Sequence, residues 1–289
     1  VMAISIKGVN TGVIRKANEF IALALKIKEP RNKESLFFLP ALELRDLLIA
    51  MESRLYQKQQ LNAAERQHYE KTRDNISKKM QENIPAIVED ELRHADIHRR
   101  VTAVALTDGS GDNITLTFTL HDGNTCVLRV NELQIEVLVY AIIRAIENAG
   151  MRELALRLSS LLDFLPLYDA DCLDHEQLEY DAYTQPEWKH ALFTHYLAVL
   201  YRFTDETGKE WFSGAIVKTR VPSGSKEAEA ISRRLLDFSP RLKKLAGKPC
   251  QAFVRTLTAD KAQTLTQEQC LRALHHLRAQ SVHTATQHA

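Results

Sequence analysis

Residues 101–130 read VTAVALTDGSGDNITLTFTLHDGNTCVLRV, and this stretch decides the fold class. Two turn sequences, DGSGDN at 108–113 and HDGN at 121–124, separate three runs in which apolar and polar residues alternate. A period of two is typical of half-buried strands, and Asp-Gly turns join antiparallel neighbours. The stretch therefore predicts a three-stranded antiparallel meander.

A helix is predicted directly after this meander. Asn131 is a good N-cap, and apolar residues recur at helical spacing from Leu133 to Ile146. The first forty residues have the same order, with strands predicted at 2–8, 13–28 and 34–39, turns at 10–12 and 30–32, and then a helix from about 40 to 60. We therefore predict an α+β fold in which a β-meander-plus-helix unit is repeated.

The segment over residues 56–93 predicts a charged helical hairpin arm. Charged residues are dense here and the apolar stripe is thin, so the second helix of the hairpin is expected to be exposed. Its few apolar and aromatic side chains are the candidate partner-binding residues, namely Tyr56, Tyr69, Ile76 and Met80.

Beyond residue 165 the repeat ends. Pro166 is followed by a stretch rich in Asp and Glu, which we interpret as an acidic linker. A hairpin, a helix, a strand and a last helix follow, forming a third α+β unit. The predicted boundaries are 1–93 for the first unit with its arm, 94–165 for the second unit, 166–190 for the linker, 191–281 for the third unit and 282–289 for a frayed tail.

Composition is that of an ordinary globular protein. The 289 residues are 45% hydrophobic and 26% charged, with a net charge of +1, so no global charge argues for a polyanion partner. No apolar run is long enough to cross a bilayer and no signal peptide is recognisable. The four cysteines are widely spaced, which favours reduced thiols. We expect a cytoplasmic protein that does not enter membranes.

Motifs for catalysis or metal binding are absent. The acidic stretch YDADCLDHE at 168–176 holds candidate ligands, but its spacing matches neither a calcium loop nor a zinc site. His275 and His276 are adjacent on a predicted helix, where side chains point about 100° apart. We assign no catalytic residue, metal or cofactor, because no nucleophile motif is present.

Basic residues are unevenly distributed and suggest a face for nucleic acid. One group includes Arg15 and Lys16, and a second lies near the end of the chain: Arg233, Arg234, Arg241, Lys243 and Lys244. If both groups share a face, the aromatic residues Phe20, Phe37, Phe38 and Phe118 could offer nucleobases a stacking surface beside cations. The alternative is that these are solvated charges and core aromatic residues.

Whole stretches of the chain resemble the enterobacterial YjeJ family of uncharacterised proteins. They are KGVNTGVIRKANEFIALALKIKEPRNKESLFF at 7–38, MRELALRL at 151–158, SLLDFLPLYD at 160–169, LDFSPRLKKLAG at 236–247 and QCLRALHHLRAQS at 269–281. The resemblance runs from Met2 to about Ser281. It implies a bacterial cytoplasmic setting and transfers no activity, cofactor or catalytic residue.

Three hypotheses for function follow. The first is a non-enzymatic binding or regulatory protein that contacts nucleic acid through a basic face. The second is a protein-interaction or self-association module that uses the helical arm, with a protein partner or a second copy bound there. The third is an enzyme with an unrecognised site that uses His175 and the neighbouring acids.

Overall fold

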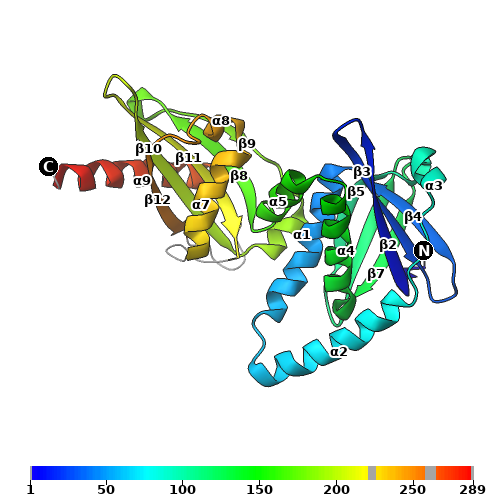
Figure 1. Cartoon of the computed structure of the whole chain (residues 1–289). Helices are drawn as coiled ribbons and strands as arrows, with labels where there is room; N and C mark the ends of the chain where they lie inside the picture. Colours follow the sequence, from blue (N-terminus) through cyan, green and yellow to red (C-terminus); the bar gives the residue numbers. More distant parts are fainter. Residues whose placement is uncertain (1, 221–225, 258–264, 288–289) are drawn as a thin grey trace. The chain divides into compact units, whose positions relative to one another are not determined.

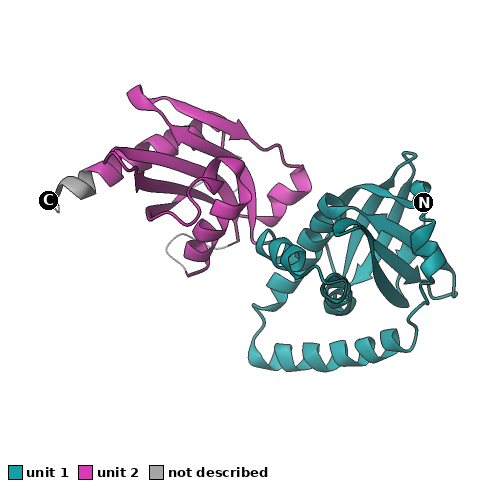
Figure 2. Ribbon diagram, turned by 45° about the horizontal axis from the view of Figure 1, so that its top comes forward, with its two compact units in different colours: residues 1–162 teal, residues 163–289 magenta. Residues whose placement is uncertain are grey.

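The computed structural model describes residues 2–220, 226–257 and 265–287, and the chain forms two compact units, 1–162 and 163–289 (Figure 2). Each unit contains both helices and strands, so the predicted α+β class is confirmed. Within the described residues, no helix is both long and apolar enough to cross a membrane.

Unit 1 contains the meander predicted from residues 101–130. Its strands β5 (Val101–Asp108), β6 (Asn113–Leu120) and β7 (Thr125–Asn131) are antiparallel neighbours, and the short β1 (Ile4–Ser5) pairs in parallel with β7. A second, three-stranded antiparallel sheet is built from β2 (Gly8–Lys16), β3 (Glu19–Lys28) and β4 (Glu34–Leu39).

The turn predicted at residues 10–12 is wrong. These residues lie inside β2, and the chain reverses at Ala17 and Asn18 instead. A Cβ on Gly12 would lie 3.4 Å from Leu92 of α3 (Glu89–Arg93), an ordinary van der Waals distance, so α3 packs against the strand at this position. Ala17 has a φ of 54°, a left-handed conformation that sequence reasoning assigns to glycine or asparagine.

Two helices follow the two meanders as predicted. Helix α1 (Ala41–Lys58) packs on β5 and β3, and α4 (Ile135–Asn148) packs on β2 after a single turn of 3₁₀ helix, η2 (Glu132–Gln134). Asn131 caps this turn by accepting the backbone N–H of Leu133 at 2.9 Å. Three strands and a helix thus follow one another in β2, β3, β4 and α1, and again in β5, β6, β7 and α4. That the two segments are copies of one repeated unit stays a prediction.

The two meander-helix segments form one unit and not the separate units predicted at 1–93 and 94–165. Their apolar faces share a core, in which the rings of Phe37 and Phe118 meet edge to face with centroids 5.2 Å apart. Alone, each meander-helix segment would expose its apolar face to water. Packing the two faces against each other buries the apolar surface of both segments.

The remaining helices of unit 1 are α2 (Ala63–Gln81), η1 (Ile97–Arg99) and α5 (Arg152–Ser160). Helix α2 begins with a capping box in which Asn62 accepts from Glu65 N and the Glu65 side chain accepts from Asn62 N. It runs along the outside of unit 1, as predicted for the arm (Figures 1 and 2).

Unit 2 is built on a five-stranded sheet in the order β12-β10-β11-β8-β9. Its elements are β8 (Phe164–Cys172), η3 (Asp174–Glu176), β9 (Leu178–Ala182), α6 (Glu187–Leu192), β10 (His195–Thr204), β11 (Glu210–Thr219), α7 (Lys226–Phe238), α8 (Pro240–Lys243), β12 (Cys250–Leu257) and α9 (Gln267–Gln287). The predicted hairpin is β10 and β11, with Trp211 opposite Phe203.

The acidic linker predicted at 166–190 does not exist as a linker. Its residues supply most of β8 and all of β9, which complete the sheet. Pro166 lies opposite Val217, next to a register shift between Ile216 and Val217, a place where a sheet tolerates proline. The acidic side chains alternate with apolar ones, so β8 keeps an apolar face.

The two faces of this sheet are covered by different helices. On one face, a Cβ at Gly214 would lie 3.0 Å from Leu274 of α9. On the opposite face, the hydroxyl of Tyr201 donates to the carbonyl of Ser232 in α7. Helix α9 continues to Gln287, so the predicted frayed tail at 282–289 is helical up to that residue, and 288–289 lie outside the described residues.

Candidate functional site

One hollow of unit 1 is lined by both an aromatic ring, which could stack on a base, and basic side chains. We call it the α5 hollow. It has a volume of about 660 Å³ and is lined by Asn18, Glu19 and Phe20 at the start of β3, by Ala41, and by residues 150–154 and 157. Gly150, with a φ of 78°, ends α4 and lets α5 start beside the β2–β3 turn.

Arg15 ties the two sides of this region together. Its Nη1 donates to the carbonyl of Ala149 at 2.7 Å, so the end of β2 is fixed to the turn before α5. Lys16 is exposed and lies opposite Glu19 in the β2–β3 ladder. The two basic residues predicted near the start of the chain therefore border the α5 hollow.

The charges that line the α5 hollow balance, since Arg152 and Arg157 are matched in number by Glu19 and Glu153. Arg15 and Lys16, at its border, add two positive charges. Within the part of the chain that the structure describes, neither Arg152 nor Arg157 forms an ion pair. These two guanidinium groups are therefore available to an anion from solution.

Of the four predicted stacking aromatics, only Phe20 is accessible. Phe37 and Phe118 have no exposed surface and Phe38 is buried, because they fill the core of unit 1. Phe20 is half-buried and lines the α5 hollow with Arg152 and Arg157. Phe37, Phe38 and Phe118 are therefore core residues, and only Phe20 of the four places an aromatic ring beside cations.

The basic residues predicted near the end of the chain are placed very differently. Four carboxylates, Asp169, Asp171, Glu179 and Asp181, share one face of the β8–β9 ladder, and we call them the carboxylate row. Arg241 of α8 lies across it. Its Nε is 3.3 Å from Asp169, its Nη1 is 2.8 Å from Asp171, and its Nη2 is 2.8 Å from Asp181. Lys244 is 2.7 Å from Asp171.

Hydrogen bonds complete this cluster. Asp169 accepts the hydroxyl of Tyr183 at 2.6 Å and that of Ser239, and Asp171 accepts the hydroxyl of Ser213 at 2.6 Å. Burial by itself would raise the pKa of Asp171, but hydrogen bonds from Lys244, Ser213 and Arg241 outweigh burial and hold this pKa below its ordinary value. The cluster is a satisfied internal network.

Arg241 and Lys244 are thus committed within unit 2. Arg234 also forms an ion pair, at 3.0 Å, with Asp163. Arg233 and Lys243 are exposed, and the described residues offer them no ion-pair partner. Of the five predicted residues in this group, these two remain available to an external anion.

The apolar residues of the arm face unit 1 itself. Met80 is buried, Tyr69, Ile76 and Tyr56 are half-buried, and Arg73 between them forms a 2.9 Å ion pair with Glu136 of α4. The amine of Lys58 lies 5.6 Å from the Tyr69 ring centroid, and burial of Tyr69 raises its pKa to about 12. These side chains hold α2 in place.

His175, the histidine of the enzyme hypothesis, lies in a second open hollow with Glu176, His275 and His276. His175 and Glu176 both have a φ near 60°, which brings the β8–β9 turn toward α9. No group of three or more His, Cys, Asp or Glu among the described residues is arranged to hold a metal ion. No catalytic arrangement follows from this geometry.

Sequence reasoning missed Arg152 and Arg157. Their spacing places them on neighbouring turns of a short helix, and nothing in that helix marks it as a ligand site. Only the fold brings them beside Phe20, which is more than a hundred residues away in the chain.

Comparison with known proteins gives a family and no activity. The family model described as YjeJ-like matches residues 2–284. The chain is 71% identical over 280 residues to the "Uncharacterized protein YjeJ" of Escherichia coli (strain K12), with 97% of each chain covered. No solved structure matches the chain.

Proposed function

Because the chain belongs to the YjeJ-like family, whose matched member is named only as an uncharacterised protein, we propose a function from geometry. The protein is a non-enzymatic binding protein that takes up single-stranded nucleic acid at the α5 hollow. One observation carries the proposal: Phe20 lines the same hollow as two arginines without ion-pair partners among the described residues.

Single-stranded nucleic acid fits this combination better than duplex does. Unpaired bases stack on aromatic rings or on guanidinium planes, while phosphates pair with nearby cations. Phe20 supplies the ring, Arg152 and Arg157 supply cations at the hollow, and Lys16 extends the positive charge along β2. A duplex keeps its bases stacked internally and could use only the charges.

The first test is fluorescence anisotropy with labelled single-stranded DNA, duplex DNA and RNA at two salt concentrations. We expect the single strands to bind more tightly than the duplex, with affinity that falls as salt rises. No binding of any probe at low salt would overturn the proposal, as would equal affinity for single strand and duplex.

Variants separate stacking from charge. The double variant Arg152→Ala, Arg157→Ala is expected to lower the affinity and flatten the salt dependence, by about 0.7 in log–log slope for each lost phosphate contact. Phe20→Ala is expected to lower affinity about fivefold or more, the equivalent of about 1 kcal/mol of stacking, with the salt slope retained. The matched control is Lys71→Ala, Lys78→Ala on the exposed face of α2, which removes two charges elsewhere in unit 1.

The predicted cytoplasmic location belongs to the same proposal, since the ligand is intracellular.

Self-association through the arm remains the alternative. It requires α2 to leave unit 1, because Tyr69, Ile76 and Met80 face inward. Sedimentation of the full chain and of a variant lacking residues 63–81 tests it: a dimer that becomes a folded monomer would favour the alternative, and a monomer in both cases would exclude it.

A further inference from the structure

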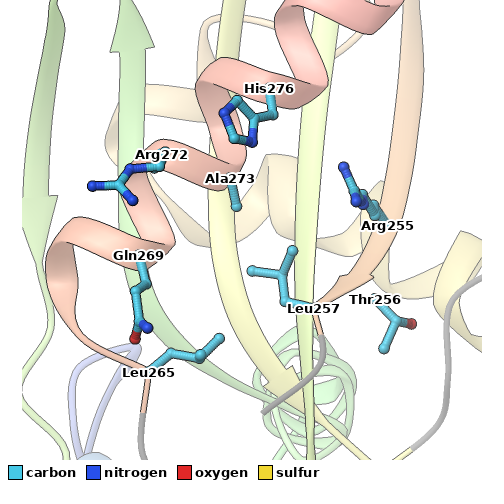
Figure 3. Close-up of a pocket in the computed structure, with 8 residues that line it drawn as sticks. All are labelled: Arg255, Thr256, Leu257, Leu265, Gln269, Arg272, Ala273 and His276. Carbon is cyan, nitrogen blue, oxygen red and sulfur yellow. The ribbon is translucent and has the colours of Figure 1, made fainter.

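A second hollow, in unit 2, has the chemistry of a small-molecule site. It lies between β12 and α9, has a volume of about 370 Å³, and is lined from β12 by Arg255, Thr256 and Leu257 (Figure 3). From the other side it is lined by Leu265 and by Gln269, Arg272, Ala273 and His276. This volume lies within the usual range for ligand cavities, at its lower end.

Most polar groups at this hollow already have partners. The Gln269 side chain accepts the backbone N–H of Thr266 at 2.8 Å as part of the α9 cap. Arg272 forms an ion pair with Glu268 one turn earlier, and its side chain extends away from β12 (Figure 3). These two residues close the wall of the hollow and do not offer free charge to a ligand.

Arg255 is the exception. It is exposed and lies opposite Ala198 in the ladder, on the sheet face that α9 covers, and its guanidinium forms no ion pair or hydrogen bond with the described residues. No described residue lining the hollow is acidic. The guanidinium of Arg255 thus faces a hollow in which the described residues supply no counter-charge, and the imidazole of His276 lies across from it on α9 (Figure 3).

The floor of the hollow is apolar. Leu257, Leu265 and Ala273 line it below Arg255 and His276 (Figure 3). The backbone N–H of Leu265 donates to the hydroxyl of Tyr196 at 3.2 Å, which fixes Leu265 against the sheet. A ligand here would bury an apolar body on this floor while an acidic group met Arg255.

We propose that the hollow between β12 and α9 binds a small monocarboxylate with an apolar body. A carboxylate carries the single negative charge that one unpaired guanidinium balances, and its two oxygens match the fork of N–H donors. The imidazole of His276 supplies a further donor. This site lies in unit 2 and is independent of nucleic-acid binding at the α5 hollow.

The test is calorimetric titration of the full chain with octanoate, with its neutral counterpart 1-octanol, and with octyl phosphate. We expect octanoate to bind at one site and more tightly than either of the others. Arg255→Gln is expected to weaken octanoate at least tenfold and to leave 1-octanol unchanged, because it removes a charged hydrogen bond and no apolar contact. Lys248→Gln, which removes an exposed charge of unit 2 outside the hollow, is the matched control.

A second variant keeps the proposal falsifiable should Arg255→Gln disturb the sheet. Ala273→Phe places a ring in the hollow from α9 and should abolish binding of both octanoate and 1-octanol, while nucleic-acid affinity is unchanged. The proposal is overturned if octanoate binds equally to wild type and Arg255→Gln, if several equivalents bind without saturation, or if octyl phosphate binds more tightly than octanoate.

Discussion

The Nε of Arg241 lies 3.3 Å from the carboxylate of Asp169, and both side chains are almost fully buried, with 12% and 3% of their surface exposed. Residues 72 positions apart are thereby joined inside unit 2. Arg241 also pairs with the other three carboxylates of the carboxylate row and balances part of their charge, so its role is structural.

Replacing Arg241 by Ala should destabilise unit 2 by about 3–5 kcal/mol, because it leaves the buried carboxylate of Asp169 without its counter-charge. Urea denaturation followed by circular dichroism measures the change. Lys243→Ala, two residues away and exposed, should change stability by less than about 0.5 kcal/mol. Equal effects of the two variants would show that the network contributes nothing.

Acid should weaken unit 2 through Asp171. Its folded-state pKa lies below the ordinary value, so the stability that this carboxylate contributes is present above about pH 4 and is lost as pH falls through the folded-state pKa. Asp171→Asn should therefore be less stable than wild type at neutral pH, and the difference should narrow below about pH 4. The exposed Asp174→Asn is the control, and a difference that stays constant with pH would contradict this assignment.

Gly8→Ala should loosen the arm. A Cβ on Gly8 would lie 1.9 Å from the carbonyl oxygen of Asn83, which follows α2, so backbone has to move. Hydrogen exchange should quicken in the last turns of α2 and in residues 82–88. Gly109→Ala is the control, because its Cβ meets only a Leu106 methyl at 3.8 Å. Unchanged exchange in both variants would mean that the arm shifts without a measurable loss of stability.

Tyr69→Phe should stabilise the protein slightly. The Tyr69 hydroxyl is buried and has no hydrogen-bond partner among the described residues, so removing it relieves a desolvation penalty of about 1 kcal/mol. The ring and its contact with Lys58 remain. Thermal unfolding compares this variant with Tyr140→Phe on the exposed side of α4, which should be neutral. A loss of stability in Tyr69→Phe would argue against an unpaired hydroxyl.

Local chemistry in the sequence was enough for most elements. The meander at 101–130, the helix capped by Asn131 and the hairpin of β10 and β11 all follow from turn residues, caps and periodicity that act over a few positions. The turn at Ala17 could not be predicted in this way, because alanine is disfavoured there and the surrounding strands impose it.

Sequence by itself determined the α+β class, the charged arm and the uneven distribution of basic residues, because these depend on composition and short-range pattern. Only tertiary structure decided that two meanders share one core, that 166–190 forms strands, and which cations are free. Arg241 and Arg152 look alike in the sequence, yet one meets three carboxylates and the other lines an open hollow. The reason is that a side chain's electrostatic partners are set by neighbours far along the chain, and folding alone brings those together.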